Sequence, residues 1–118
     1  MGMTTVLIVD DHPMFRANAR EVLESEGFTV VGEAENGAEA LAAFERVHPE
    51  VVLLDVQLPD ADGFELASRL TANGARVNVV LVSSRDYSDL THLVERSGAR
   101  GFVPKAELSG PRLAALVT

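Results

Sequence analysis

Side chains that could do chemistry follow four of the five valine-rich segments of this sequence. Asp10 and Asp11 come directly after the first segment, Asp55 after the third, Ser83 after the fourth and Lys105 after the fifth. Three carboxylates brought to one place would repel one another strongly unless a cation lay between them, and oxygen ligands suit Mg²⁺. Magnesium takes one or two carboxylates together with waters and phosphate oxygens. These residues therefore predict phosphoryl chemistry at a Mg²⁺ site.

The segments that carry these residues are short, rich in valine and mostly uninterrupted by polar residues. This pattern is typical of strands that are covered on both faces in a parallel sheet. The segment over residues 29–34 includes Gly32 and Glu33, so we expect it at an edge of the sheet. The expected strands are residues 4–9, 29–34, 51–54, 78–82 and 101–103.

Apolar residues at helical spacing fill the intervals between these strands. A first helix is expected from Pro13 until Gly27 ends it, with Pro13 suited to the first turn because it has no N–H to leave unpaired. A second is expected after Asn36-Gly37 and before Pro49. Its expected apolar stripe is Ala38, Leu41, Ala42 and Phe44. Further helices are expected over 63–72, closed by the turn Asn73-Gly74, over 87–97 with Leu90, Leu93 and Val94 on one face, and from Leu108 or Pro111 to the end.

Strand and helix thus alternate along the whole chain, which predicts an open, doubly wound α/β sheet in one domain over residues 1–118. In such sheets ligands bind at the carboxyl ends of the strands, where the strand order reverses. The polar residues named above stand at those ends. We also expect the last helix to stop short of the usual length of a crossover, as in a part of a longer protein.

The composition excludes several other classes of protein. With 47% apolar residues the 118-residue chain can bury a core, and its formal charge of −8 disfavours direct binding to a nucleic acid. The chain has no cysteine, which excludes disulfides, thiolate zinc sites and thiol nucleophiles. No apolar run approaches the ~20 residues of a membrane helix. Since no signal peptide is visible, a cytoplasmic location is expected.

Each candidate site residue also has a purely structural interpretation. Asp10 and Asp11 could cap the helix that begins at Pro13, and Asp55 could serve only to form a turn. Ser83 could satisfy a backbone group at the end of its strand, and a lone lysine is usually a solvated surface charge. Four strand ends that all supply groups fit for one metal–phosphate site nevertheless favour the functional interpretation.

Four motifs resemble those of a receiver domain of two-component response regulators. They are VLIVDDHP at residues 6–13, VLLDVQLPDADG at 52–63, VLVSS at 80–84 and GFVPK at 101–105. Asp55 precedes Ser83 by 28 positions and Lys105 by 50, spacings similar to receivers of the NarL/LuxR class of transcription factors. The resemblance implies a flavodoxin-like fold, with five parallel strands in the order 2-1-3-4-5 and five flanking helices.

The resemblance also implies a role for each residue of the site. It makes Asp55 the phosphoacceptor and gives the Mg²⁺ to Asp10, Asp11, Asp55 and the backbone carbonyl of Gln57. Lys105 would bind an oxygen of the phosphoryl group.

The resemblance implies a conformational switch as well. Ser83 would move toward the new phosphate, and Phe102 would follow into the space that Ser83 vacates. A core aromatic with no such role is the alternative interpretation of Phe102.

Other polar residues near the motifs receive different assignments. We expect Asp62 to cap the third helix, and neither Asp60 nor Asp62 to bind the metal. His12 has no second histidine or cysteine at metal spacing, so it is expected to be a loop residue or a contact to a kinase. Arg85, two positions after Ser83, is a candidate for tuning hydrolysis of the acyl phosphate.

The implied partner is a sensor histidine kinase or a phosphotransfer protein. The domain would act as a switch that catalyses only its own phosphorylation and dephosphorylation, with no direct contact to nucleic acid or membrane and with dimerisation on activation left open. Its output would be transcription, through a domain outside this chain. The alternatives are a standalone adaptor and a phosphohydrolase of the haloacid dehalogenase class, although those enzymes carry Asp-x-Asp on the first strand where this chain has Asp10-Asp11-His12.

Overall fold

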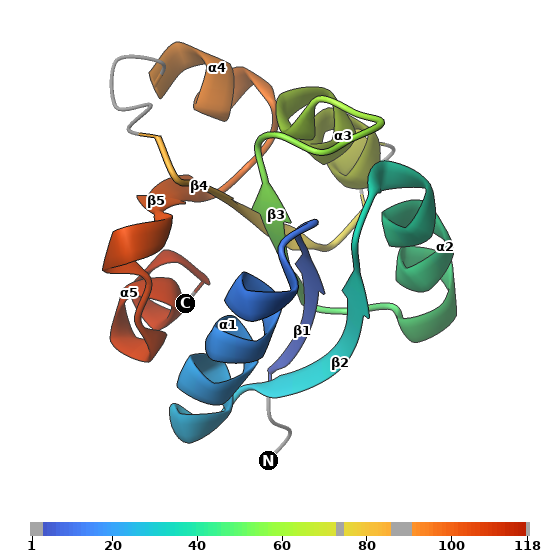
Figure 1. Ribbon diagram of the computed structural model, residues 1–118. Helices are drawn as coiled ribbons and strands as arrows, with labels where there is room; N and C mark the ends of the chain where they lie inside the picture. The colour runs from blue at the N-terminus through green and yellow to red at the C-terminus, as the bar shows by residue number, and fades with distance from the viewer. Residues whose placement is uncertain (1–3, 73–74, 86–90, 118) are drawn as a thin grey trace.

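The computed structural model describes residues 4–72, 75–85 and 91–117, and in these residues five parallel strands form one sheet. The strand order is β2-β1-β3-β4-β5, as predicted (Figure 1). The strands are β1 (Thr5–Val9), β2 (Thr29–Ala34), β3 (Val51–Asp55), β4 (Asn78–Ser83) and β5 (Gly101–Pro104). Each predicted strand is present, and the bounds differ by one residue at most. β3, β4 and β5 run one residue further than predicted, so Asp55 and Ser83 belong to their strands.

The valine-rich strands lie in the middle of the sheet, where both faces are covered. Every residue of β3 is buried, and so is every residue of β1 and β4 except the first. β2 lies at an edge, as its sequence predicted, and its register against β1 shifts between Val6 and Leu7. Parallel pairing puts the carboxyl ends of β1, β3, β4 and β5 at one edge of the sheet.

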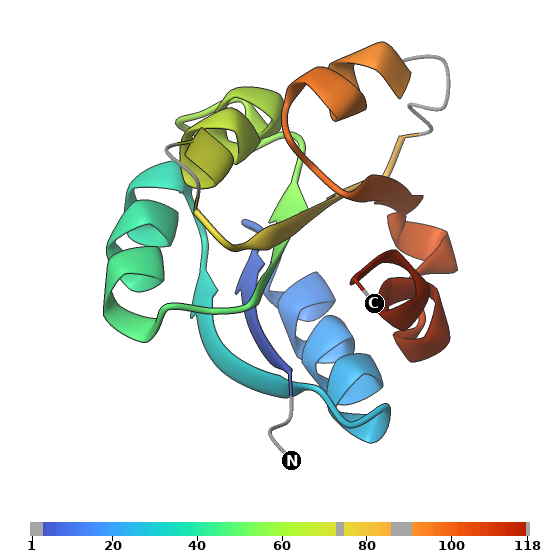
Figure 2. The ribbon, with the colours of Figure 1, turned by 180° about the vertical axis from the view of Figure 1, so that it is seen from behind.

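Helices cover both faces of the sheet and enclose two apolar cores. α1 and α5 pack on one face, and α2, α3 and α4 pack on the other (Figures 1 and 2). Alternate residues of the central strands point to opposite faces, so Val6 and Ile8 enter the first core while Leu7 and Val9 enter the second. The helices are α1 (Pro13–Ser25), α2 (Gly37–Val47), α3 (Gly63–Thr71), α4 (Thr91–Arg96) and α5 (Gly110–Val117), with a 3₁₀ turn η3 (Lys105–Glu107) before α5.

The buried face of α2 differs from the predicted stripe. Ala38 and Ala42 are exposed, so that part of the prediction is wrong. Smaller residues face the sheet instead, and the absence of bulk lets the helix lie close to β1 and β2. The fully buried positions are Gly37, Ala40 and Ala43, while Leu41 and Phe44 are partly buried at the margin of the same core.

Two predicted features extend beyond the described residues. The expected helix over 87–97 is seen as α4 from Thr91 to Arg96, with Val94 buried, while its expected first turn and Leu90 lie outside the described residues. The turn Asn73-Gly74 also lies outside them. The last helix begins at Gly110, between the two predicted starts, because η3 takes up the residues directly after Lys105.

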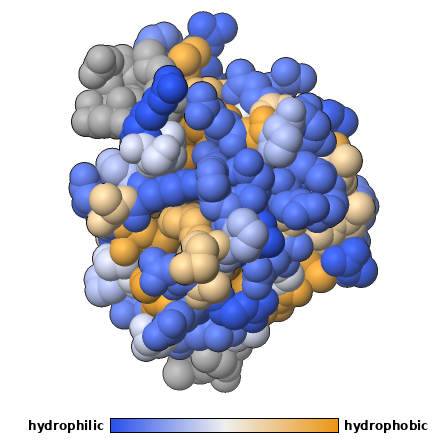
Figure 3. Space-filling model, in the orientation of Figure 1, coloured by the Kyte–Doolittle hydropathy of each residue, from blue (hydrophilic) through white to orange (hydrophobic). Residues whose placement is uncertain are grey.

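The surface is mainly polar. Figure 3 shows hydrophilic side chains over most of the face in view, with apolar ones visible between α1 and α5. Met14, near the start of α1, is a large apolar side chain that is 84% exposed. Among the helices of the described residues, none combines the length and the apolar character that crossing a membrane requires.

A test of the fold is the substitution Gly63→Ala. A Cβ at Gly63 would meet the backbone oxygen of Asp55 and lie 2.6 Å from the Cα of Val56. We expect this overpacking to lower the free energy of unfolding by about 1–3 kcal/mol, measured by urea denaturation, although alanine favours helix more than glycine does. Ser68→Ala, on the exposed face of the same helix, is the control and should be nearly neutral. A more stable Gly63→Ala variant would show that α3 does not press against the end of β3.

Candidate functional site

The carboxyl ends of β1 and β3 bring the three predicted carboxylates together. Ligand atoms of Asp10, Asp11, His12 and Asp55 all lie within 4.8 Å of one another. Asp10 follows β1 directly and is fully buried, and Asp55 is the last residue of β3 and is also buried. Asp11 is more accessible, with 36% of its side chain exposed. The predicted clustering of these acids is confirmed.

Lys105 reaches the same cluster from the end of β5. Its Nζ lies 2.7 Å from Asp10 Oδ2 and 3.3 Å from Asp55 Oδ2, and it also stands 4.6 Å from the centre of the Phe15 ring. Only 14% of the Lys105 side chain is exposed. The lysine is therefore a partly buried counter-ion of two carboxylates, and its interpretation as a solvated surface charge is wrong.

Backbone amides hold one oxygen of each buried carboxylate. The His12 N–H donates to Asp10 Oδ1 at 2.8 Å, and the Gln57 N–H donates to Asp55 Oδ1 at 3.1 Å. Both aspartates thus form local turns, as the structural interpretation of Asp55 proposed, and these turns fix the orientation of the carboxylates. The side chain of neither Asp10 nor Asp11 caps α1, because its N-cap residue is His12 and no side-chain bond is made there.

The environment of Asp55 disfavours its charged form. Burial is the largest cause and raises the pKa of its carboxyl group, and the negative charge of Asp10 acts in the same direction. The Gln57 N–H and the Lys105 ammonium oppose this but do not cancel it, so the pKa of Asp55 stays above its ordinary value. A cation beside Asp55 would therefore stabilise the charged form of its carboxyl group.

Ser83 and Phe102 lie on the neighbouring strands, outside the carboxylate cluster. Ser83 ends β4 and is buried, and its Oγ accepts the Arg85 N–H at 3.1 Å, as expected for a serine that satisfies a strand end. In the sheet Ser83 pairs with Pro104, the residue before Lys105. Phe102 is partly buried on β5 and lines a cavity of about 490 Å³ together with residues of α4 and α5. Their roles in a switch stay predictions.

His12 is a loop residue before α1, as expected, and its ring also joins the cluster. A contact to a kinase stays a prediction. The His12 Nδ1 lies 2.9 Å from Asp10 Oδ1 and 3.1 Å from Asp11 Oδ1. The absence of a second histidine or cysteine at metal spacing made this position look unimportant. The only signal in the sequence was that His12 follows the acidic pair directly.

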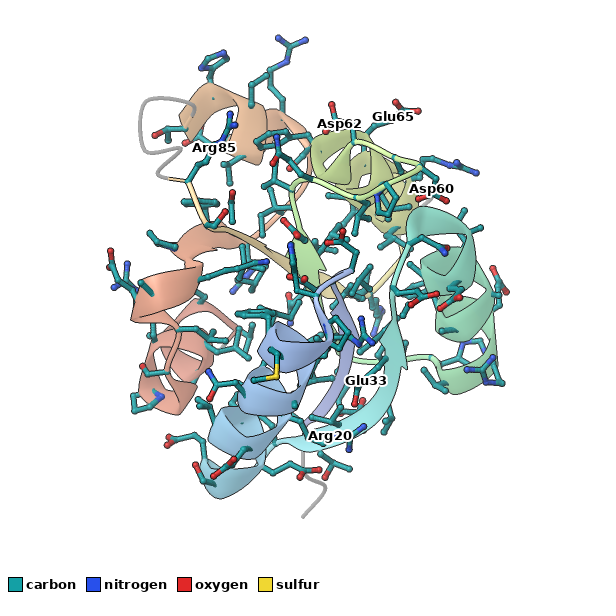
Figure 4. The ribbon with its side chains drawn as sticks, in the orientation of Figure 1. Arg20, Glu33, Asp60, Asp62, Glu65 and Arg85 are labelled. Carbon is teal, nitrogen blue, oxygen red and sulfur yellow. The ribbon has the colours of Figure 1, made fainter. Side chains whose placement is uncertain are left out.

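The loop after Asp55 keeps its acidic side chains away from the cluster. Asp60 accepts the N–H groups of Gly37 at 2.7 Å and of Ala38 at 3.1 Å, which lowers its pKa and fastens the loop to the start of α2. Asp62 Oδ1 accepts the Phe64 N–H at 2.8 Å and so caps α3, as predicted. Figure 4 shows both residues beside the starts of these helices. Gln57 pairs with Asp62 across the loop, and the role of its carbonyl as a metal ligand stays a prediction.

The donor set fits a hard divalent cation. Asp10 Oδ2 and Asp11 Oδ1 are buried oxygens that receive no well-directed hydrogen bond, and the contact of Lys105 to Asp10 is an ion pair without hydrogen-bond geometry. One ammonium group faces three carboxylates. Buried carboxylate oxygens that lack a hydrogen bond and converge on one place are the ligands that Mg²⁺ prefers.

Comparison with known proteins gives one consistent family. The family described as the response regulator receiver domain matches residues 6–117. A Pseudomonas aeruginosa protein named as a transcriptional regulator is 41% identical over 105 residues, which are 89% of this chain and 51% of that protein. The chain thus spans about half the length of the curated transcription regulators that it matches.

Two solved structures extend the comparison to three dimensions. The signal receiver domain of the response regulator NarL from Mycobacterium tuberculosis has a TM-score of 0.86 and 31% identity and covers 98% of both chains. CheY in the CheX–CheY–BeF₃–Mg²⁺ complex from Borrelia burgdorferi has a TM-score of 0.84 and 26% identity, over 97% of this chain and 86% of that one.

The raised pKa of Asp55 predicts a stability that depends on pH. The folded state holds the Asp55 proton more tightly than the unfolded state, so stability falls as pH rises from the ordinary carboxyl range through the folded pKa, and the loss persists at neutral pH. Without metal, we therefore expect Asp55→Asn to be more stable than the parent at pH 7, by an amount that shrinks toward pH 4. Urea denaturation in the presence of a chelator measures this difference.

Asp60→Asn is the matched control. The pKa of Asp60 is lowered, so the expected change in stability has the opposite sign. That variant should be less stable than the parent at pH 7, with the difference fading as pH falls through the folded pKa of Asp60. An Asp55→Asn variant that is less stable than the parent at neutral pH would contradict the account of burial given for Asp55.

Proposed function

This chain belongs to the response regulator receiver domain family, and from that premise we propose that Asp55 accepts a phosphoryl group from a phosphohistidine in a Mg²⁺-dependent reaction. Receiver domains of this family act as phosphorylation-controlled switches. The observation that carries the proposal is the position of Asp55, buried at the end of β3 in the same cluster as the acidic pair and 3.3 Å from the Lys105 ammonium. A phosphoryl group on this carboxylate would lie within reach of Lys105 and of a cation held by the cluster.

Receiver domains bind Mg²⁺ at an acidic cluster of this kind. In this chain Asp10, Asp11 and Asp55 would hold the ion, and the Gln57 carbonyl would complete the protein ligands. A bound Mg²⁺ supplies charge neutralisation for the phosphoryl oxygens, which otherwise repel the attacking carboxylate. The CheY of the Borrelia burgdorferi complex, similar in fold, was solved with BeF₃ and Mg²⁺, and this supports the assignment.

In the phosphoryl transfer, the protein itself forms only one covalent bond. An Asp55 carboxylate oxygen forms a bond to phosphorus as the bond from phosphorus to the imidazole nitrogen of the donor breaks, and the imidazole leaves with the electron pair. A carboxylate is a weak nucleophile, so the rate depends on alignment and on charge stabilisation. Lys105, now 3.3 Å from Asp55, would turn its ammonium to an oxygen of the new phosphoryl group.

A switch would follow from the new charge on Asp55. Ser83, whose Oγ accepts the Arg85 N–H, would turn its hydroxyl group to donate to a phosphoryl oxygen, and Phe102 would move into the space beside it. Phe102 lines the cavity between α4, β5 and α5, so this movement would alter the surface there. Arg85 would influence how fast water hydrolyses the acyl phosphate, because its backbone is tied to Ser83.

Receiver domains typically interact with histidine kinases or phosphotransfer proteins, and we assign this chain the same partners in the cytoplasm. The relative from Pseudomonas aeruginosa carries the name of a transcriptional regulator, and this chain matches about half of its length. Transcription is therefore the output that we propose, with DNA contacts made by another part of the protein and not by this acidic domain. Homodimerisation on activation belongs to this proposal.

A standalone adaptor is the second candidate. Its support is the Borrelia burgdorferi CheY, of which this chain covers 86% and which was solved with a partner, CheX. A phosphohydrolase with a free substrate is disfavoured, because the best nucleophile stands on β3 and the first strand is followed by Asp10-Asp11-His12. The domain is thus assigned as a switch that acts only on its own phosphoryl group.

The phosphoacceptor assignment predicts one specific adduct. Incubation with Mg²⁺ and phosphoramidate should add one phosphoryl group that is stable to acid and labile to base, detected by intact mass spectrometry. Asp55→Asn and addition of a chelator should each abolish it, whereas Asp60→Asn should retain it because Asp60 lies at α2 and not in the cluster. Equal labelling of Asp55→Asn would disprove the assignment, and repeated turnover of a free phosphate ester would favour the hydrolase.

The switch assignment predicts a local change of conformation. With Mg²⁺ and fluoroberyllate, we expect the amide and side-chain NMR signals of Ser83 and Phe102 to shift, together with residues that line the α4–β5–α5 cavity. Ser83→Ala should bind fluoroberyllate but lose the shift of Phe102, because it lacks the hydroxyl group that would reach the anion. Bound fluoroberyllate with unchanged Phe102 signals in the parent would show that Phe102 is only a core aromatic.

A further inference from the structure

Arg16 of α1 reaches back from the helix to the loop that carries the acidic pair. Its Nη1 donates to the backbone carbonyl of Asp10 at 2.6 Å, and its Nε donates to Glu33 Oε1 of β2 at 3.1 Å. Only 15% of the side chain is exposed. The guanidinium group therefore bridges the end of β1 and the neighbouring edge strand, and it does not touch the carboxylates of the site.

Glu33 holds the guanidinium group in place from the other side. Its second carboxylate oxygen accepts Arg20 Nε at 2.9 Å, and Figure 4 shows Arg20 and Glu33 side by side where α1 meets β2. Arg20 also pairs with Glu24 at 3.3 Å, one helical turn further on. Arginine presents its donors in a rigid plane, which suits a bridge between a carbonyl and a carboxylate, whereas the ammonium of a lysine is a single point charge.

The bond from Arg16 is one of several contacts that fix Asp10. The Asp10 N–H donates to Ala34 O at 2.9 Å, and Asp10 Oδ1 accepts the His12 N–H at 2.8 Å. The carbonyl is the remaining backbone group, and Arg16 binds it. No side chain caps the start of α1, and the Arg16 side chain ties the first turn of this helix to the Asp10 carbonyl.

We propose that Arg16 is a positioning residue of the metal site, which sets the place of the Asp10 and Asp11 carboxylates through the Asp10 carbonyl and is itself held by Glu33. This inference rests on the Mg²⁺ binding of the proposed function. Substituting a residue that binds a metal ligand commonly lowers metal affinity by 10–100-fold, because such a residue orients the ligand without touching the ion.

The direction in which Mg²⁺ affinity changes distinguishes a positioning role of Arg16 from an effect of its charge. A guanidinium group near the site repels a divalent cation, so losing its charge alone would strengthen Mg²⁺ binding. Losing the bridge would weaken Mg²⁺ binding, because the loop of Asp10 and Asp11 would no longer be held in the binding arrangement. Arg16→Met removes both the charge and the bridge, and Arg16→Lys removes the bridge while it keeps the charge.

The experiment is a Mg²⁺ titration of the whole chain, followed by isothermal calorimetry and by the amide NMR signals of Asp10 and Asp11. We expect Arg16→Met to bind Mg²⁺ about 10-fold more weakly than the parent and Arg16→Lys to lose affinity as well. Arg20→Met is the matched control, since Arg20 shares Glu33 but does not bind Asp10. Its affinity should stay the same or rise slightly.

The outcomes distinguish this inference from the proposed function. A parent that binds no Mg²⁺, or that binds it equally well after Asp55→Asn and Asp10→Asn, would overturn the proposed site itself. A parent that binds Mg²⁺ while Arg16→Met and Arg16→Lys bind it as tightly or more tightly would overturn only the role of Arg16. If Arg16→Met does not fold, Arg16→Lys decides, because it keeps the charge of residue 16 and should still show weaker binding.

Discussion

The burial of two like charges, on Asp10 and Asp55, is the constraint around which this fold is organised. Both carboxylates stand at the ends of adjacent parallel strands, where they are almost fully buried. One ammonium group, from Lys105, is shared between them, and two backbone N–H groups bind the oxygens on the other side. The protein alone therefore leaves the site with excess negative charge, which is the condition that favours a divalent cation.

The strands could be predicted from the sequence because their residues have one dominant role. Valine and leucine in uninterrupted runs can be satisfied only between two layers of helices, so β1, β3 and β4 fall where the pattern indicates. Helix α2 was harder because alanine fits both an exposed and a buried position. Ala40 and Ala43 are buried and Ala42 is exposed, and only the distance to the sheet decides between them.

The functional site likewise has residues that could be predicted from the sequence and contacts that could not. Asp10, Asp11, Asp55 and Lys105 stand directly at strand ends, so strand order alone brings them together. The supporting contacts could not be predicted, because they depend on how far a side chain reaches across a loop. Asp60 binds the start of α2, 22 and 23 positions earlier in the chain, and Arg16 binds a carbonyl group, which any residue type would have supplied. Such contacts leave no periodic or compositional trace.

The contacts at the strand ends also indicate how a change at Asp55 could reach the surface. The ends of β1 and β3 are held by backbone bonds and by the link from α1 to Asp10, so they have little freedom to move. Ser83 and Lys105 stand at the ends of β4 and β5, and each contacts its neighbours through a side chain that can rotate. A new negative charge on Asp55 would draw these two side chains first. Phe102 lies on β5 three residues before Lys105 and borders the α4–β5–α5 cavity, so this side of the sheet offers a physical path from the carboxylates to a hollow at the surface.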